Sequence, residues 1–224
     1  MLRVWWADFG DDHRDFHEVA PQLPALRSFT VDCTDGLPRM ACLLQAFPAL
    51  DDTLSFNQAE VASWWPLDDR LNLVRDENKR AQESHCWAGL DRVSCEARVF
   101  VILGLMCPIR HADVVDCSTL TRDSVATALR DNPPRRLTLS VELERGPSVL
   151  HGLFPSELEP TLTHLVVTLR CAEGDDRRGP PDFDFLARVQ LDELLDMFLH
   201  SIARLCPRWI RLSFYSHSDS RAEF

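Results

Sequence analysis

Apolar and polar residues follow two different periods between residues 23 and 56. In 26–31 and in 54–56, apolar side chains alternate with polar ones, which is the period of a strand with one buried face. Between these stretches, residues 37–47 carry apolar side chains at helical spacing, and a proline follows them. The segment therefore predicts a strand, an amphipathic helix and the start of a second strand.

The same strand pattern recurs along the whole chain. One inward-facing residue marks each expected strand: Val4, Phe29, Leu54, Val93, Ala112, Leu137, Leu165 and Ile210. The spacing of 25 residues at the start of this series lies in the range of leucine-rich repeats, whose strand and helix units bury their apolar faces only against neighbouring units. Connections of this length favour parallel pairing, because a hairpin needs only a few residues.

We therefore predict an α/β fold, a leucine-rich-repeat-like solenoid or horseshoe with a parallel sheet on its concave side and helices on its convex side. One domain is expected over residues 1–215, with insertions at about 57–88 and 171–188 and a polar tail over 216–224. The segment from 57 to 88 is interpreted as an inserted helix or loop. Further helices are expected near 13–22, over 99–105, after Ser118 or Thr119, and over 188–205.

The composition narrows the possible partners and compartments. The 24 basic and 35 acidic residues give a net charge of −11, which disfavours binding of the whole surface to nucleic acid. Neither a signal peptide nor a membrane-spanning apolar run is visible, so we expect an intracellular protein, cytoplasmic or nuclear, without a membrane partner. The eight cysteines never form a C-x-x-C pair, so we expect most of them to be reduced core residues rather than zinc ligands or disulfides.

Catalytic and metal-binding patterns are weak. His13 and His17 stand four residues apart on an expected helix among acidic residues, but no third ligand is identifiable, and an acidic, solvated helix face is the favoured interpretation. His85 and Cys86 are adjacent, yet no supporting carboxylate or oxyanion site accompanies them. We predict no catalytic activity, no cofactor and no metal; the alternative is an enzyme or metal-binding protein that uses a pocket in the inserted segments.

Four phrases of the sequence carry a resemblance to a known family: LPALRSFTV, FPALDDTLSF, LTHLVVTL and RWIRLSF. Together with the irregular unit length and the use of tryptophan and cysteine, they resemble the leucine-rich region of fungal F-box-type proteins. In that family an amino-terminal F-box binds the Skp adaptor of a cullin-based ubiquitin ligase, and the repeats select the substrate. An F-box is not expected here, because the first strand begins at Leu2. The resemblance implies a protein-binding scaffold, whose partner is a ubiquitin-ligase substrate or another protein.

The strand period also predicts which side chains face the concavity. One row comprises Trp5, Thr30, Ser55, Ser94, Asp113, Thr138, Val166 and Arg211, and the preceding row comprises Arg3, Ser28, Thr53, Arg92, His111, Arg136, His164 and Trp209. Four arginines and two histidines against one aspartate predict a mildly basic surface for an acidic or polar segment of a partner. The alternative is that these arginines pair with acidic neighbours such as Glu96 and Glu142.

The predicted partner-binding residues come from these rows and from the insertion. They are Arg3, Trp5, Arg92, His111, Arg136, His164, Trp209 and Arg211, together with Trp64 and Trp65. The two adjacent tryptophans are included because exposed aromatic residues often anchor interfaces, although one of them could instead cover the edge of the core.

Overall fold

A computed structural model describes residues 1–8, 22–57, 59–60, 69–143, 146–171 and 191–216. Nine strands lie in these ranges. They are β1 (Leu2–Asp8), β2 (Ser28–Asp35), β3 (Thr53–Phe56), β4 (Ala59–Glu60), β5 (Leu90–Glu96), β6 (Ile109–Cys117), β7 (Arg136–Glu142), β8 (His164–Cys171) and β9 (Trp209–Ser216). All of them join one sheet, in which every pairing is parallel.

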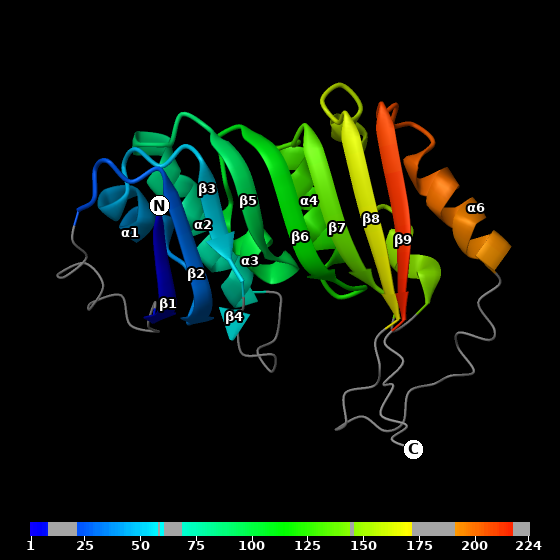
Figure 1. Cartoon of the computed structure of the whole chain (residues 1–224), viewed down its shortest axis with the longest axis horizontal. Coiled ribbons are helices and arrows are strands. Elements are labelled where there is room, and N and C mark those ends of the chain that lie inside the picture. Colours follow the sequence, from blue (N-terminus) through cyan, green and yellow to red (C-terminus); the bar gives the residue numbers. More distant parts are fainter. Residues whose placement is uncertain (9–21, 58, 61–68, 144–145, 172–190, 217–224) are drawn as a thin grey trace, which may run out of the picture.

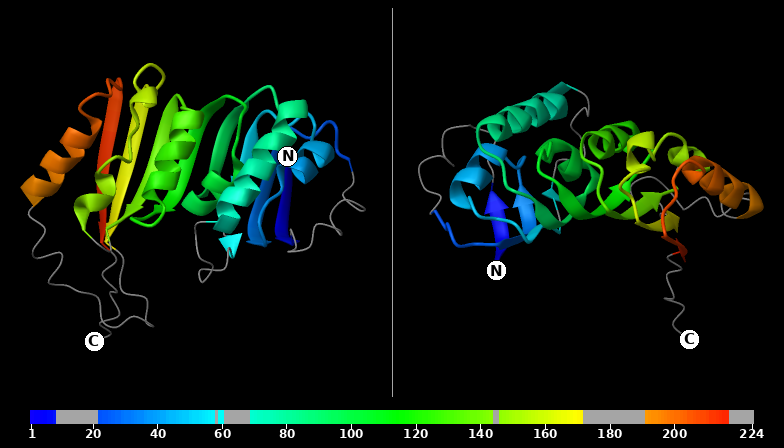
Figure 2. Two further views of the ribbon diagram at one scale, coloured as in Figure 1. Left: turned by 180° about the vertical axis from the view of Figure 1, so that it is seen from behind. Right: turned by 90° about the horizontal axis from the view of Figure 1, so that it is seen from above.

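Strand order in the sheet follows chain order, from β1 at one edge to β9 at the other, except that the short β4 pairs with β2 (Figure 1). The helices of the described residues lie together on one face of this sheet, as the view from above shows (Figure 2). They are α1 (Met40–Ala46), α2 (Asp69–Ser84), α3 (Ala97–Leu103), α4 (Arg122–Asp131) and α6 (Leu191–Ile202), with short 3-10 turns η1 (Pro147–Leu150) and η2 (Ser156–Leu158). The prediction of an α/β fold with a parallel sheet is confirmed.

The predicted register is correct from β2 to β9. Phe29 pairs with Leu54, Leu54 with Val93, and the series continues through Ala112, Leu137, Leu165 and Ile210. The expected level of β1 is wrong by two residues, because Leu2 rather than Val4 pairs with Phe29. A shift of two residues leaves the same side chains on the buried face, so the alternation alone does not distinguish these two registers.

The segment 57–88, expected to be an inserted helix or loop, contains the helix α2 within the described residues. Its helix α2 lies between α1 and α3 in the helical layer and buries Leu71 and Val74 against the core. The amides of Asn78 and Gln82 are also buried there and bond to backbone groups of neighbouring segments. The segment therefore contributes an ordinary helix to the stack, which its charged sequence concealed.

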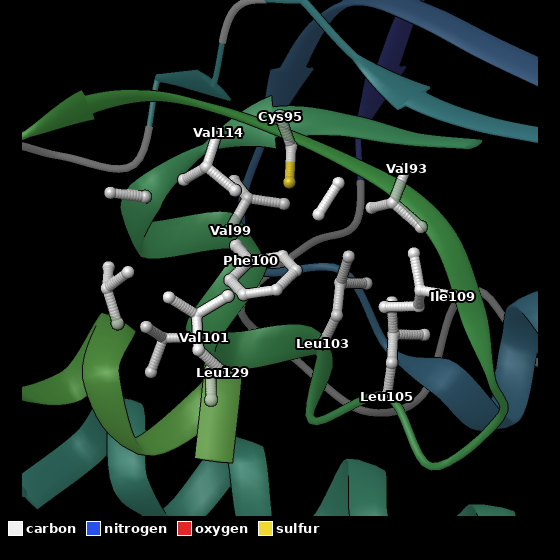
Figure 3. Packing of buried hydrophobic residues seen from close by; sticks show 14 of the residues in the cluster. Val93, Cys95, Val99, Phe100, Val101, Leu103, Leu105, Ile109, Val114 and Leu129 are labelled. Carbon is white, nitrogen blue, oxygen red and sulfur yellow. The ribbon is translucent and has the colours of Figure 1, made fainter. Parts of the chain in front are cut away.

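The core lies between the helices and the inner side of the sheet. Figure 3 shows how Val93 and Cys95 of β5 meet Phe100 and Leu103 of α3 and Leu129 of α4, all of them buried. The inward residues of β2, β3, β5, β6, β7 and β8 belong to this one continuous cluster, to which Leu2 and Val4 of β1 and Leu212 of β9 contribute as partly buried members. Such a layer is stable because each strand and helix unit covers the apolar side of the next.

The remaining predicted helices agree in part. The apolar run near 99–105 forms α3, and residues 188–205 include α6. Helix α4 begins two or three residues later than expected, with Thr121 at its N-cap instead of Ser118 or Thr119. The expected helix near 13–22, most of the insertion at 171–188 and most of the tail lie outside the described residues.

Candidate functional site

The candidate site is the helix-free face of the sheet, which we call the open face (Figure 2). Successive side chains of a strand point to opposite sides, so the residues between the buried ones stand on this face. Parallel pairing aligns these residues in rows that run across the sheet, and neighbouring members of a row stand on strands about 4.8 Å apart. Each row therefore brings together side chains that are distant in the sequence.

Two rows were predicted, and the register defines their members. The first comprises Arg3, Thr30, Ser55, Ser94, Asp113, Thr138, Val166 and Arg211. The second comprises Ser28, Thr53, Arg92, His111, Arg136, His164 and Trp209. The assignments of β1 are corrected: Arg3 belongs to the first row, and Trp5 stands one row further along, level with Asp32. The other strands hold the predicted positions.

Two of the four arginines in these rows are already paired. Arg3 donates two hydrogen bonds to Asp32, at 2.7 and 2.8 Å. Asp32 also accepts a hydrogen bond of 2.7 Å from the amide of Asn57. The hydrogen bond from Arg3 is the main cause that lowers the pKa of Asp32. Near β1 and β2 the positive charge of the open face is thus compensated within the protein.

A second compensated pair lies in the middle of the sheet. Arg92 donates to Asp113 at 2.7 Å, across the boundary between β5 and β6. Further along the strands, Arg170 reaches Asp116 at 3.1 Å and Glu142 at 3.3 Å. Pairing of arginines with acidic neighbours, the alternative interpretation, therefore describes part of the open face.

Arg136 of β7 and Arg211 of β9 differ from these arginines. Both are exposed, and neither makes a hydrogen bond or ion pair to any described residue. His164 and Trp209 stand in the same row as Arg136, with ring centroids 6.1 Å apart. We call Arg136, His164, Trp209 and Arg211 the β7–β9 patch; it concentrates the uncompensated positive charge of the two rows at one end of the sheet.

His111 does not add charge to this surface. It is half-buried, and burial is the largest cause that lowers its pKa, followed by the charge of Arg92. Its Nε2 lies 3.2 Å from the hydroxyl of Thr138. The lowered pKa keeps the imidazole neutral at pH 7, so His111 is a polar neighbour of Arg136 rather than a cation.

The predicted aromatic residues do not form one site. Trp209 is 46% exposed in the β7–β9 patch, whereas Trp5 is 80% exposed on β1 at the opposite edge of the sheet. Trp64 and Trp65 lie outside the described residues. The structure thus brings Arg136, His164, Trp209 and Arg211 together and separates them from Arg3 and Trp5.

The prediction from sequence missed Asp32 and Arg170, which modify the charge of the open face. Asp32 is the next outward residue of β2 after Thr30, so a third row, one step further along the strands, would have included it. Arg170 lies two strands from Asp116, at a separation of 54 residues along the chain. Nothing in the local sequence indicates that contact.

Four of the described cysteines, Cys42, Cys95, Cys107 and Cys117, are buried, whereas Cys206 is exposed. Burial raises the pKa of Cys107 and of Cys117 to about 12 and raises that of Cys95 further. Cys86, the neighbour of His85 in the sequence, is half-buried, and burial raises its pKa as well. Thiols with raised pKa values are poor nucleophiles at neutral pH.

Within the described ranges, no three histidine, cysteine or acidic side chains are grouped so that they could hold a metal ion. His13 and His17 lie outside those ranges. A cavity beside Arg75 and Asp131 has a volume of about 10 Å³, which is roughly the space that one water molecule needs. Among the helices that the structure describes, none combines the length and the apolar composition needed to span a bilayer.

No family model, no curated protein and no solved structure matches the chain.

Proposed function

We propose that this protein is a binding scaffold of the leucine-rich-repeat type, whose β7–β9 patch receives an acidic segment of a partner protein. The observation that carries the proposal is the pair of exposed arginines, Arg136 and Arg211, without an acidic partner among the described residues. His164 and Trp209 beside them supply a hydrogen-bonding group and an aromatic surface, which are common in protein interfaces.

The strand order supports a surface site rather than a crevice. In doubly wound α/β folds, ligands bind where the strand order reverses and neighbouring connections leave on opposite faces. The strand order here runs from β1 to β9 without such a reversal, and the described helices share one face. No described helix covers the other face, which is the side on which repeat proteins of the horseshoe type bind their partners.

Uncompensated arginines are the better contacts for an acidic partner. A carboxylate that binds Arg3 or Arg92 must compete with Asp32 or Asp113, each within 2.7 Å. At Arg136 and Arg211, no described carboxylate competes with the partner in this way. A hydrogen bond to a charged group contributes about 1.5–3 kcal/mol, so we expect the double variant Arg136→Glu/Arg211→Glu to weaken binding at least about tenfold, at about 1.4 kcal/mol per decade.

The experiment selects a defined ligand and then removes the charge. A phage-displayed peptide library is selected on the wild-type protein, and the enriched peptides are synthesised and measured by fluorescence anisotropy. We expect the enriched peptides to be rich in aspartate and glutamate, and their affinity for the double variant to fall at least tenfold.

The matched control carries the same change of charge on the helical face. Arg80→Glu/Arg98→Glu alters two arginines of α2 and α3. The control should bind the acidic peptides within about twofold of the wild type. Equal loss in both variants would show a non-specific effect of net charge, and an unchanged affinity in Arg136→Glu/Arg211→Glu would refute the proposed site.

The resemblance to F-box-type proteins supports a specific class of partner within this proposal, a substrate of a ubiquitin ligase in the cytoplasm or nucleus. Tagged protein expressed in fungal cells tests it through recovery of the Skp adaptor. Recovery supports a role in a ligase, whereas acidic partners recovered without the adaptor support a free-standing scaffold.

A further inference from the structure

Strand β9 forms an edge of the sheet that is unusually well suited to pairing. It is aligned with β8 at eight consecutive positions, from Trp209 to Ser216, without a bulge, and no described strand pairs with its other side. Its sequence, WIRLSFYS, contains no proline and no lysine. Bulges, prolines and lysines are among the means by which proteins keep edge strands from pairing, and β9 has none of these three.

The helix-side residues of β9 are incompletely covered. Ile210 is 43% and Phe214 is 49% exposed, whereas their partners Leu165 and Leu169 on β8 are fully buried. Figures 1 and 2 place α6 beside β9 at this end of the sheet. Leu199 of α6 is 57% exposed, so the apolar layer continues up to the edge and ends in solvent.

The open-face side of the same strand carries a different chemistry. Trp209 is 46% and Tyr215 51% exposed, and between them stands Arg211 without an acidic partner among the described residues. A strand beside β9 would place alternate side chains on these two sides. One set would meet Ile210 and Phe214, and the other would meet Arg211.

The opposite edge does not share these properties. Leu2 and Val4 of β1 are half-buried and pack against the core. Arg3, the open-face arginine of that strand, is already bound to Asp32 through two hydrogen bonds. Of the two edges, β9 therefore combines exposed apolar side chains with an arginine that has no acidic partner among the described residues, and β1 does not.

We propose that the partner adds an extended strand to the free edge of β9. Its apolar residues at alternate positions pack on Ile210 and Phe214, and a carboxylate at an intervening position binds Arg211. The acidic character of this segment rests on the proposed function, whereas the backbone pairing and the apolar contacts rest on the edge itself. Addition of a strand to an exposed edge is a known mode of peptide recognition, in which main-chain hydrogen bonds supply affinity.

The first test uses a fluorescein-labelled octapeptide that alternates valine and glutamate. A second octapeptide carries the same four valines and four glutamates in two blocks. We expect the alternating peptide to bind at least tenfold more tightly, because only alternation sorts the two residue types onto opposite sides of a strand. Equal affinities would overturn the inference.

The second test detects the backbone pairing and requires no change to the protein. N-methylation of every second residue removes the N–H groups on one side of the peptide strand, and methylation of the other residues removes those on the other side. A strand pairs with its neighbour through alternate residues only. One series should lose at least tenfold in affinity and the other should remain within about twofold; equal effects of both series would overturn the inference.

A third test changes the apolar side of the edge. Phe214→Lys should weaken binding of the alternating peptide at least tenfold, while Leu73→Lys, a matched change at a leucine of α2 that is 54% exposed, should not. Circular dichroism and thermal melting of both variants verify the fold. Equal affinities of Phe214→Lys and the wild type would overturn the inference.

Other occupants of the edge give distinct results. Sedimentation could show that the wild type is a dimer of about 51 kDa, twice the 25.6 kDa chain, and that Phe214→Lys is a monomer. This result would assign the edge to a second copy and overturn the inference. Binding of the alternating peptide only after removal of residues 217–224 would assign it to the chain itself.

The two proposals fail separately. If peptide binding depends on Arg136 and Arg211 but both N-methylated series lose affinity equally, the proposed function is retained and strand addition is rejected. If one N-methylated series loses affinity and the other does not, while Arg136→Glu/Arg211→Glu leaves the affinity unchanged, strand addition is retained and the acidic site is rejected.

Discussion

Replacement of Asn78 by alanine tests how the helical layer is held together. The side chain is 2% exposed and makes three hydrogen bonds to the backbone. Its Oδ1 accepts from the N–H of Met40 at 2.8 Å, and its Nδ2 donates to the carbonyls of Pro38 at 3.0 Å and Ile102 at 2.8 Å. Met40 is the first residue of α1 and Ile102 lies in the last turn of α3, positions at which a helix leaves backbone groups unpaired.

The expected loss follows from these three contacts. A backbone group that is left buried without a partner costs about 1–3 kcal/mol, so Asn78→Ala should lower the free energy of unfolding by about 3 kcal/mol or more. For a chain of this size, about 1 kcal/mol corresponds to about 2–4 °C in Tm. We therefore expect Tm to fall by about 6–12 °C.

Urea unfolding of the wild type and of Asn78→Ala measures the difference. Glu83→Ala is the control, because Glu83 lies on the exposed side of the same helix. An exposed substitution of this kind usually changes stability by no more than about 0.5 kcal/mol. If Asn78→Ala loses less than about 1 kcal/mol, the buried amide does not join α1, α2 and α3 as argued.

Two further predictions concern a helix end and a histidine. Gly104 follows α3 at φ +52°, and an added Cβ would lie 3.1 Å from the carbonyl oxygen of Arg75. We therefore expect Gly104→Ala to lower the free energy of unfolding by about 2 kcal/mol, measured by urea unfolding. The loss should exceed that of Gly152→Ala, because Gly152 has φ +74° but open surroundings. The pKa of His111 is lowered by burial in the folded state, so its contribution to stability is present above the unfolded pKa of about 6.5 and is lost as the pH falls through the folded value. Between pH 7.5 and 5 the urea midpoint of the wild type should therefore fall more than that of His111→Gln, and parallel pH profiles would contradict the assignment.

The sequence by itself determined the strands, the parallel sheet and most of the register. A strand with one buried face must alternate, and Phe29, Leu54, Leu137 and Leu165 mark that alternation clearly enough to align their strands correctly. The rows on the open face followed from the same rule. Local periodicity was sufficient because the buried side of each strand is specified residue by residue.

The sequence left open the level of β1 and the place of α2. Both registers of β1 that differ by two residues bury Leu2 and Val4, so contacts with β2 decide between them. The charged surface of α2 suggested an insertion, yet the partners of Asn78 stand 24 to 40 residues away in the chain. Such contacts have no local signature.

The candidate site was likewise determined in two steps. The alternation placed Arg3, Arg92, Arg136 and Arg211 on the open face, but only the folded chain decided that the first two are paired, whereas the last two have no acidic partner among the described residues. Pairing depends on which carboxylates neighbouring strands bring within hydrogen-bonding distance, and Asp32 lies 29 residues from Arg3. Periodicity along a strand fixes the face of a side chain, whereas its electrostatic partners are set across strands by the tertiary structure.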